Sequence, residues 1–363
     1  MPTIPITMKA VLLKGQGGFD QLEYRDDVPV PRLRTGEVLI RVAAAGVNNT
    51  DINTRTGWYA KSVTEGTTSE GGAAGYATAT ADTTGWSGAA LAFPRIQGAD
   101  VCGRIVAVAD GVDPARIGQR VLIEPVLREP VGGKPYQACY FGSEWDGGFA
   151  EYTKVPAIHA HKIESGLADA ELASFPCAYS AAENMLTRAG LTAGETILIT
   201  GASGGVGSAA VQLAKRRGAS VVAMTSASKA EQVKTLGADK IVPRNADLLD
   251  SLGRDVADVV VDVVGGPRWP ELLEVLKRGG RYAVAGAIAG PMVALDLRVL
   301  YLKDLRFLGC TILEPDVFRA LVGYIERREI KPVVANTYPL KEIVRAQQEF
   351  LGKRFTGKIV LIP

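Results

Sequence analysis

The chain has 363 residues, of which 47% are hydrophobic and 22% are charged, a composition typical of a folded globular protein with room for two domains. Its 41 basic and 39 acidic residues almost cancel, and no basic run is dense enough to neutralise a row of phosphates, so nucleic acid is not an expected partner. No apolar segment is long enough to span a bilayer, and the first residues lack signal-peptide character. We therefore expect a cytoplasmic protein that does not bind membranes.

The first part of the chain is predicted to be rich in β-strands, because short apolar runs alternate with Gly and Pro residues. The predicted strands cover residues 9–13, 37–44, 103–109, 119–123 and 149–155.

From about residue 168 the pattern changes, and apolar segments alternate with helical stretches such as 208–217 and 230–236. This alternation predicts a parallel sheet covered by helices, so the whole chain is expected to be an α/β protein. Two further helices, near 315–328 and 340–351, precede a last strand at 357–362.

Residues 61–92 depart from both patterns, because they are rich in Gly, Ala, Ser and Thr and have no steady hydrophobic period. A stretch of this length inside a compact domain is either a tolerated surface loop or a functional lid. The sequence leaves both interpretations open.

A glycine-rich turn follows the apolar strand at residues 197–200 and precedes a helix and a second strand, SVVAM. This order is the one that a dinucleotide-binding βαβ unit requires, since small residues let the backbone approach the pyrophosphate at the helix amino terminus. The predicted cofactor-binding residues of the turn are Ser203, Gly204, Gly205, Val206 and Gly207.

The choice of dinucleotide is predicted from the end of that second strand, where an acidic residue would favour NAD by binding the ribose 2′-hydroxyl. The chain has no acid there. Thr225, Ser226 and Lys229 stand in its place, with Arg244 after the next strand, and such side chains can bind the 2′-phosphate of NADPH. We therefore predict NADPH as the cofactor, with a solvated Lys229 as the alternative.

At this point the sequence resembles the medium-chain dehydrogenase/reductase superfamily over nearly its whole length. The resemblance rests on several motifs together: MKAVLL from Met8, GVNNTDINTRTGWY from Gly46, QGADVCGRIVAV from Gln97, WDGGFAEY from Trp145, FPCAYSAAENM from Phe175, ASGGVG from Ala202, LKRGGRYAVAG from Leu276 and the terminal FTGKIVLIP.

The resemblance implies a GroES-like catalytic domain, residues 1–164 and 314–363, joined to a doubly wound Rossmann domain, residues 165–313. It also implies a homodimer, in which the last Rossmann strand, near residues 306–313, pairs with its copy across a two-fold axis.

Zinc members of the superfamily carry a Cys-His pair where this chain has Asn48-Asn49, and Gly-His-Glu where it has Gly98-Ala99-Asp100. Cys177 matches the third ligand, but one thiol and one carboxylate are too few for a catalytic zinc. We therefore predict no metal. His159 and His161 are interpreted as a solvent-facing strand pair rather than a metal site.

Without a Lewis acid, the easier chemistry is hydride transfer from NADPH to an already polarised acceptor, such as a quinone or an α,β-unsaturated carbonyl. The stretch from Asn48 to Tyr59 is similar to that of the zinc-independent quinone oxidoreductase and enoyl reductase branch. This likeness implies Tyr59 as proton donor and Asn48 as a residue near the nicotinamide that orients the substrate carbonyl. Packing of Tyr59 beside Trp58 is the alternative.

Two alternative functions remain open from the sequence. One is an alcohol dehydrogenase or carbonyl reductase that uses the same fold and cofactor. The other is a non-catalytic NADPH-binding protein, similar to the lens crystallins of this superfamily. The acceptor is expected to be a small molecule whose identity the sequence does not determine.

Overall fold

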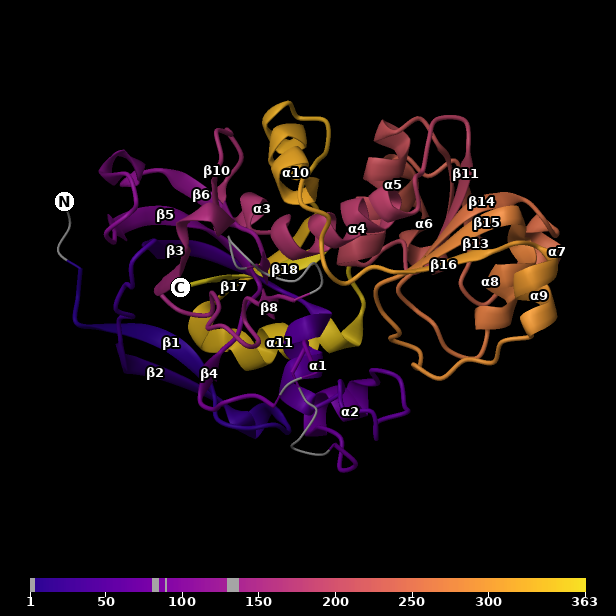
Figure 1. Cartoon of the computed structure of the whole chain (residues 1–363). Coiled ribbons are helices and arrows are strands. Elements are labelled where there is room, and N and C mark those ends of the chain that lie inside the picture. Colours follow the sequence, from indigo (N-terminus) through magenta and orange to yellow (C-terminus); the bar gives the residue numbers. More distant parts are fainter. Residues whose placement is uncertain (1–3, 80–84, 89, 129–136) are drawn as a thin grey trace.

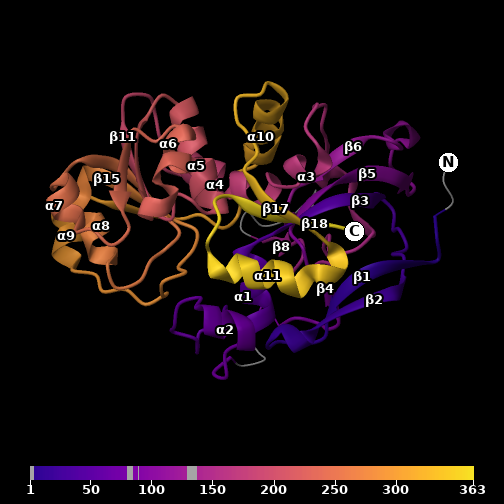
Figure 2. The same cartoon turned by 180° about the vertical axis from the view of Figure 1, so that it is seen from behind.

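A computed structural model describes residues 4–79, 85–88, 90–128 and 137–363. Figure 1 shows two parts side by side, a strand-rich part that contains both ends of the chain and a sheet covered by helices. The C-terminal strands return to the strand-rich part and lie beside β3, a neighbourhood that the reverse view in Figure 2 also shows. Among the described residues, no helix is both long and apolar enough to cross a bilayer.

The strand-rich part is built on β3, which is buried along most of its length because it pairs with β5, β9 and β18. The central sheet has the order β10-β6-β5-β3-β18-β17, and a smaller sheet has the order β2-β1-β4. The strands are β1 (Thr7–Leu13), β2 (Leu22–Pro29), β3 (Glu37–Val47), β4 (Arg95–Ile96), β5 (Asp100–Val108), β6 (Arg120–Ile123), β7 (Val126–Leu127), β8 (Cys139–Tyr140), β9 (Tyr152–Pro156), β10 (Ala160–Lys162), β17 (Val334–Pro339) and β18 (Lys358–Ile362). The predicted strands of this part are thus present, with ends shifted by a few residues.

The second part is a parallel sheet with the order β13-β12-β11-β14-β15-β16, which is the strand order of a Rossmann fold. Its central strands are almost completely buried because helices cover both faces. The strands are β11 (Thr196–Ile199), β12 (Ser220–Thr225), β13 (Lys240–Pro243), β14 (Ala257–Asp262), β15 (Leu276–Val284) and β16 (Arg306–Gly309). The prediction of a doubly wound α/β domain is confirmed.

The predicted helices are present with altered ends. The helix after the glycine turn begins at Gly205, three residues early, because the turn itself continues into the helix from an extended Gly204. The helices are α1 (Asn49–Thr56), α2 (Ser69–Ala74), α3 (Asp169–Leu172), α4 (Pro176–Arg188), α5 (Gly205–Arg216), α6 (Ala230–Thr235), α7 (Leu248–Leu252), α8 (Trp269–Val275), α9 (Leu297–Leu302), α10 (Val317–Glu326) and α11 (Ile343–Gly352). Short 3-10 turns are η1 (Phe19–Gln21), η2 (Pro114–Arg116), η3 (Ala157–His159), η4 (Ala227–Lys229) and η5 (Leu340–Glu342). The described strands of the two parts lie on either side of the predicted division at residues 165 and 313, and those boundaries stay a prediction.

The unusual segment 61–92 contains α2, which packs against α1 and α11. Residues 80–84 and 89 of this segment lie outside the described residues. Its packing depends on the buried Arg55 of α1, whose guanidinium donates hydrogen bonds to the carbonyl of Gly72 at 2.5 Å and to Gln347 of α11 at 3.0 Å. A buried cation with such partners holds α2 against α11 and the rest of the strand-rich part, which we call the catalytic part.

Candidate active site

A cavity of about 530 Å³ opens at the carboxyl ends of β11 and β12, where the glycine turn leads into α5. The strand order reverses between β11 and β14, and sheets of this order bind dinucleotides at that point. Every residue predicted to bind the cofactor lines this cavity: Ser203, Gly204, Gly205, Val206, Gly207, Thr225, Ser226, Lys229 and Arg244. The fold therefore gathers segments from three successive strand ends around one space.

The glycine turn keeps the cavity open because side chains are excluded from two of its positions. Gly201 has a φ of 58°, in the left-handed region. A Cβ on Gly207 would lie 2.2 Å from the carbonyl oxygen of Gly201. The amino terminus of α5 borders the cavity through Gly205, and an anionic pyrophosphate is stabilised at such a helix end.

At the far end of the cavity, Lys229 and Arg244 lie close enough for their charges to interact. Burial and the nearby Arg244 charge both lower the pKa of Lys229. A phosphate between the two side chains would remove this repulsion. The hydroxyl of Thr225 is buried in the same wall and has no hydrogen-bond partner among the described residues. These residues could hold an anionic group of a bound dinucleotide.

Lys353 also lines this cavity, and the sequence analysis did not identify it. Lys353 directly follows α11. Its Nζ donates a hydrogen bond to Asn49 Oδ1 at 2.9 Å. The backbone carbonyl of Lys353 accepts a 2.6 Å hydrogen bond from Lys229 Nζ. Burial, together with the charges of Lys229 and Lys358, lowers the pKa of Lys353 to about 7. The only sequence signal was the basic run KRFTGK, whose position depends on how the chain returns to the catalytic part.

A buried ion pair lies in the strand-rich part, beside Asn49 and Gly357, which line the cavity. Lys358 Nζ lies 2.7 Å from Asp100 Oδ2, and both side chains are almost completely buried. Asn48 joins this pair, since its Nδ2 donates to Asp100 Oδ2 at 2.8 Å and its Oδ1 accepts from Lys358. The other oxygen of Asp100 accepts a 2.5 Å hydrogen bond from the amide of Cys177.

The cluster around this ion pair does not suit a catalytic zinc. The positions that correspond to zinc ligands hold Asn48, Ala99 and Cys177, and an ammonium occupies the free side of Asp100. The Cys177 sulfur instead contacts the hydroxyl of Tyr140 at 3.0 Å, and burial raises the pKa of the Cys177 thiol to about 12. In the described ranges, no group of three or more His, Cys, Asp or Glu side chains is arranged to hold a metal ion.

Asp51 braces the start of α1. Its Oδ2 accepts from the amide of Asn48 at 2.7 Å, and its Oδ1 accepts from the amide of Gly98 at 3.2 Å. Burial raises the pKa of Asp51 to about 7 despite these hydrogen bonds. The carboxylate therefore joins the two strand ends that carry Asn48 and Asp100.

Tyr59 follows α1, and its ring packs edge-on against Trp58 with ring centres 5.8 Å apart. The hydroxyl donates to Thr50 Oγ1 at 3.3 Å. Burial raises the pKa of Tyr59 to about 12, although hydrogen bonds with Thr50 and Asn53 oppose the shift. Neither Tyr59 nor Asn48 lines the cofactor cavity, whereas the neighbouring Asn49 does. The catalytic roles predicted for them stay predictions.

The interpretation of the histidines as a solvent-facing pair is wrong for His159. The structure buries His159 in η3, where its Nδ1 lies 3.2 Å from Glu124 Oε2, and His161 Nε2 contacts the same oxygen at 3.2 Å. Burial alone would raise the pKa of Glu124, but the two histidines lower it to about 2. The buried carboxylate of Glu124 therefore contacts both histidine rings through one oxygen.

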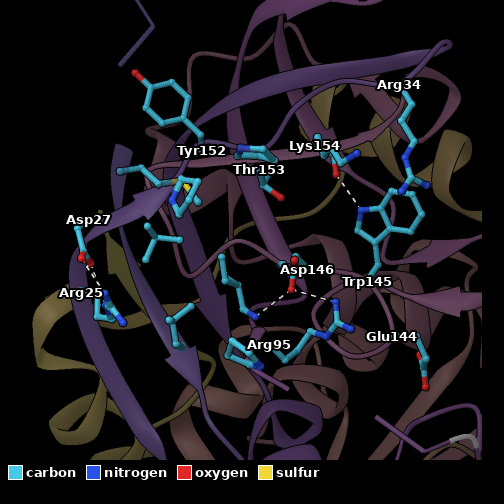
Figure 3. A pocket seen from close by; sticks show the side chains of 18 residues that line it. Arg25, Asp27, Arg34, Arg95, Glu144, Trp145, Asp146, Tyr152, Thr153 and Lys154 are labelled. Carbon is cyan, nitrogen blue, oxygen red and sulfur yellow. Dashed lines mark hydrogen bonds and ion pairs between the residues drawn. The ribbon is translucent and has the colours of Figure 1, made fainter. Parts of the chain in front are cut away.

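A second cavity of about 590 Å³ lies between β1, β2 and the 144–154 segment. Figure 3 shows that charged side chains surround its rim and that they pair with one another, Arg25 with Asp27 and Arg95 with Asp146. None of the predicted site residues lines it. We therefore place the candidate active site at the first cavity.

Comparisons with known proteins match the chain over its whole length. Residues 205–327 match the family described as zinc-binding dehydrogenase, and residues 34–165 match the alcohol dehydrogenase GroES-like domain. The acryloyl-coenzyme A reductase of Metallosphaera sedula is 30% identical, over 98% of this chain and 99% of its own. The chloroplastic NADPH-dependent alkenal/one oxidoreductase of Arabidopsis thaliana is 30% identical, over 99% of this chain and 81% of its own.

A solved protein of Sinorhizobium meliloti 1021, provisionally named an alcohol dehydrogenase, is 47% identical and superposes with a TM-score of 0.90 over 100% of this chain and 98% of its own. The matched families cover both parts of the fold, and the strand order and the glycine turn agree with them. The chain therefore belongs to the medium-chain dehydrogenase/reductase superfamily and is an oxidoreductase that uses a nicotinamide cofactor.

Proposed function

We propose that this protein is a metal-independent reductase that transfers hydride from NADPH to an α,β-unsaturated carbonyl compound or a quinone. The observation that carries the proposal is the buried Lys358–Asp100 pair, which stands with Asn48 where a zinc site would need ligands. Alcohol oxidation is easier where a Lewis acid acidifies the hydroxyl. An activated alkene or quinone needs no such help. Two relatives that are 30% identical are named acryloyl-coenzyme A reductase and NADPH-dependent alkenal/one oxidoreductase.

The proposed cofactor-binding residues are among those that line the 530 Å³ cavity. The glycine turn and the start of α5 would hold the pyrophosphate, while Ser226, Lys229 and Arg244 would bind the 2′-phosphate. NADPH bound there supplies the hydride. Lys353 adds a further cation from the catalytic part.

On the acceptor side, the phenol of Tyr59 is the proposed proton donor, because its raised pKa keeps it protonated at neutral pH. Asn48 is the proposed carbonyl-orienting group. One of its amide hydrogens binds Asp100, and the other makes only a long 3.4 Å contact with the Gly46 carbonyl. That second hydrogen is the one available to a substrate oxygen.

The test is an assay of NADPH and NADH oxidation with an enone, an enoyl thioester, a quinone and a ketone, using wild-type protein and a Tyr59→Phe variant. We expect turnover with an enone, enoyl thioester or quinone, and a loss of about 100-fold in kcat for Tyr59→Phe on the alkene substrates, as for removal of a general acid. The exposed Tyr24 provides a matched control, Tyr24→Phe. Full turnover by Tyr59→Phe would remove the tyrosine from the mechanism.

A second candidate is a carbonyl reductase or alcohol dehydrogenase, favoured by the name given to the 47% identical relative. Reduction of the ketone alone would support it. Tight NADPH binding without turnover of any acceptor would instead indicate a non-catalytic cofactor-binding protein.

We also propose a homodimer that pairs along β16, the outermost strand of the parallel sheet. The stretch that leads into this strand exposes several large apolar side chains, and edge strands of this kind pair readily with a copy. These are Met292, Val293, Leu295, Leu297, Tyr301, Leu302 and Phe307. Sedimentation of a Phe307→Glu variant tests the proposal, because the dimer mass should fall to that of a monomer, whereas an unchanged mass would contradict pairing here.

A further inference from the structure

The segment that follows Tyr59 contacts the opposite part of the molecule at Gly66 and Thr67. The backbone amide of Thr67 donates a 2.8 Å hydrogen bond to the carbonyl of Ile288. Ile288 and Ala289 belong to the loop after β15 and line the cofactor cavity. The approach is close, since a Cβ on Gly66 would lie 2.6 Å from the Ile288 oxygen. The segment is therefore in direct backbone contact with the cofactor side.

The side chain of the same threonine reaches the other way, into the catalytic part. Thr67 Oγ1 donates to Asn53 Oδ1 at 3.2 Å, and Asn53 is 7% exposed on α1. An amide that accepts with its oxygen must turn its NH₂ to the other side. Asn53 lies three residues after Thr50 in α1, on the helix face that the Tyr59 hydroxyl contacts through Thr50. Burial raises the pKa of Tyr59, and the Asn53 side chain opposes that rise. The hydroxyl of Tyr59 donates to Thr50, so its oxygen is the atom that can accept from the Asn53 NH₂.

We propose that Thr67 is a positioning residue for proton transfer, which holds the Asn53 amide with its NH₂ toward the oxygen of Tyr59 and ties this arrangement to the loop that borders the cofactor. The inference rests on the proposed function, since it assigns a second layer of residues to the same reaction.

The chemical consequence follows from the charge that develops on Tyr59. When hydride has added to the β-carbon of the acceptor, the O–H bond of Tyr59 breaks and its proton goes to the enolate carbon, which leaves a phenolate that water later reprotonates. Burial disfavours that phenolate. An N–H donor that points at the phenolate oxygen stabilises the phenolate. An Asn53 amide turned the other way would place its own oxygen there and repel the phenolate.

The test uses Thr67→Val, which keeps the backbone hydrogen bond to Ile288 and deletes the hydroxyl. We expect kcat with an enone to fall about three- to tenfold, the range for loss of one hydrogen bond, and the solvent deuterium isotope effect on kcat to rise as proton transfer becomes slower. Affinity for NADPH should not change. Thr67→Ser retains the donor and should restore both kcat and the isotope effect. Thr64→Val, at an exposed threonine of the same segment, is the matched control.

Asn53→Asp provides a second variant of the same size, which replaces the NH₂ donor by an acceptor and should lower kcat further than Thr67→Val. If Thr67→Val and Asn53→Asp retain wild-type kcat and isotope effects while Tyr59→Phe is impaired, the inference is wrong and the proposed function stands. If Tyr59→Phe is itself unimpaired, the proposed proton donor fails, and the role of Thr67 fails with it.

Discussion

The two sides of the active site differ in how they are built. The residues predicted to bind the cofactor all come from one stretch of the chain, 203–244, and offer backbone, glycine and a few surface cations, while residues elsewhere in the chain complete the cavity. The acceptor side is assembled from segments far apart in the sequence, around a buried ion pair between Asp100 and Lys358. We infer that substitutions on the acceptor side affect folding, whereas those on the cofactor side affect ligand selection.

The largest effect that tests this contrast is expected for Lys358→Met. Removal of the ammonium leaves the carboxylate of Asp100 buried without its partner, and breaking such a pair costs about 3–5 kcal/mol of unfolding free energy. Urea unfolding measures the change. The double variant Asp100→Asn with Lys358→Met should recover part of the loss, because no buried charge remains. Lys162→Met, at an exposed ion pair, is the control. A Lys358→Met protein as stable as wild type would remove the distinction between the two sides.

The contrast also explains what could be predicted from the sequence. The glycine turn, the strand order and the cations at positions 229 and 244 were predictable, because they follow one another within a single βαβα stretch whose spacing is fixed by backbone geometry. Lys353 and Lys358 were not identified, since their distance from the glycine turn along the chain gives no signal of contact.

The same reasoning applies to the histidines and to the 61–92 segment. Alternation along a strand predicts a shared face for His159 and His161, but it cannot show that both rings contact Glu124, which directly follows β6. The low hydrophobicity of 61–92 gives no sign that Arg55 and Thr67 anchor the segment by polar contacts, or that Val63 is buried and Trp86 stacks on Tyr140.

On the cofactor side, the double variant Lys229→Ala with Arg244→Ala should change ligand selection and leave stability nearly unaltered. Two charge-assisted hydrogen bonds to the 2′-phosphate are lost, so we expect KM for NADPH to rise about 10- to 100-fold, while KM for NADH, which lacks that phosphate, stays within about twofold. Steady-state kinetics with both cofactors gives the ratio. Lys234→Ala, at an exposed ion pair of α6, is the control. Equal loss for both cofactors would place the 2′-phosphate elsewhere.

The smallest effect concerns Lys353, which belongs to the catalytic part but lines the cofactor cavity. In the folded protein the pKa of Lys353 is about 7, against an ordinary value of 10.5. Between these two pH values the unfolded chain binds more protons than the folded protein does. Ionisation of Lys353 therefore makes the unliganded protein more stable as the pH rises from 7. Cofactor affinity should show the opposite trend, because a bound phosphate favours the charged amine and binding takes up a proton. We expect NADPH to bind about three- to tenfold more weakly at pH 8.5 than at pH 6.5, by fluorescence titration. Lys353→Met should remove this dependence, and a parallel titration with NADH separates it from ionisation of the 2′-phosphate. A wild-type affinity that does not vary with pH would show that Lys353 lies out of reach of the phosphates and belongs energetically to the acceptor side.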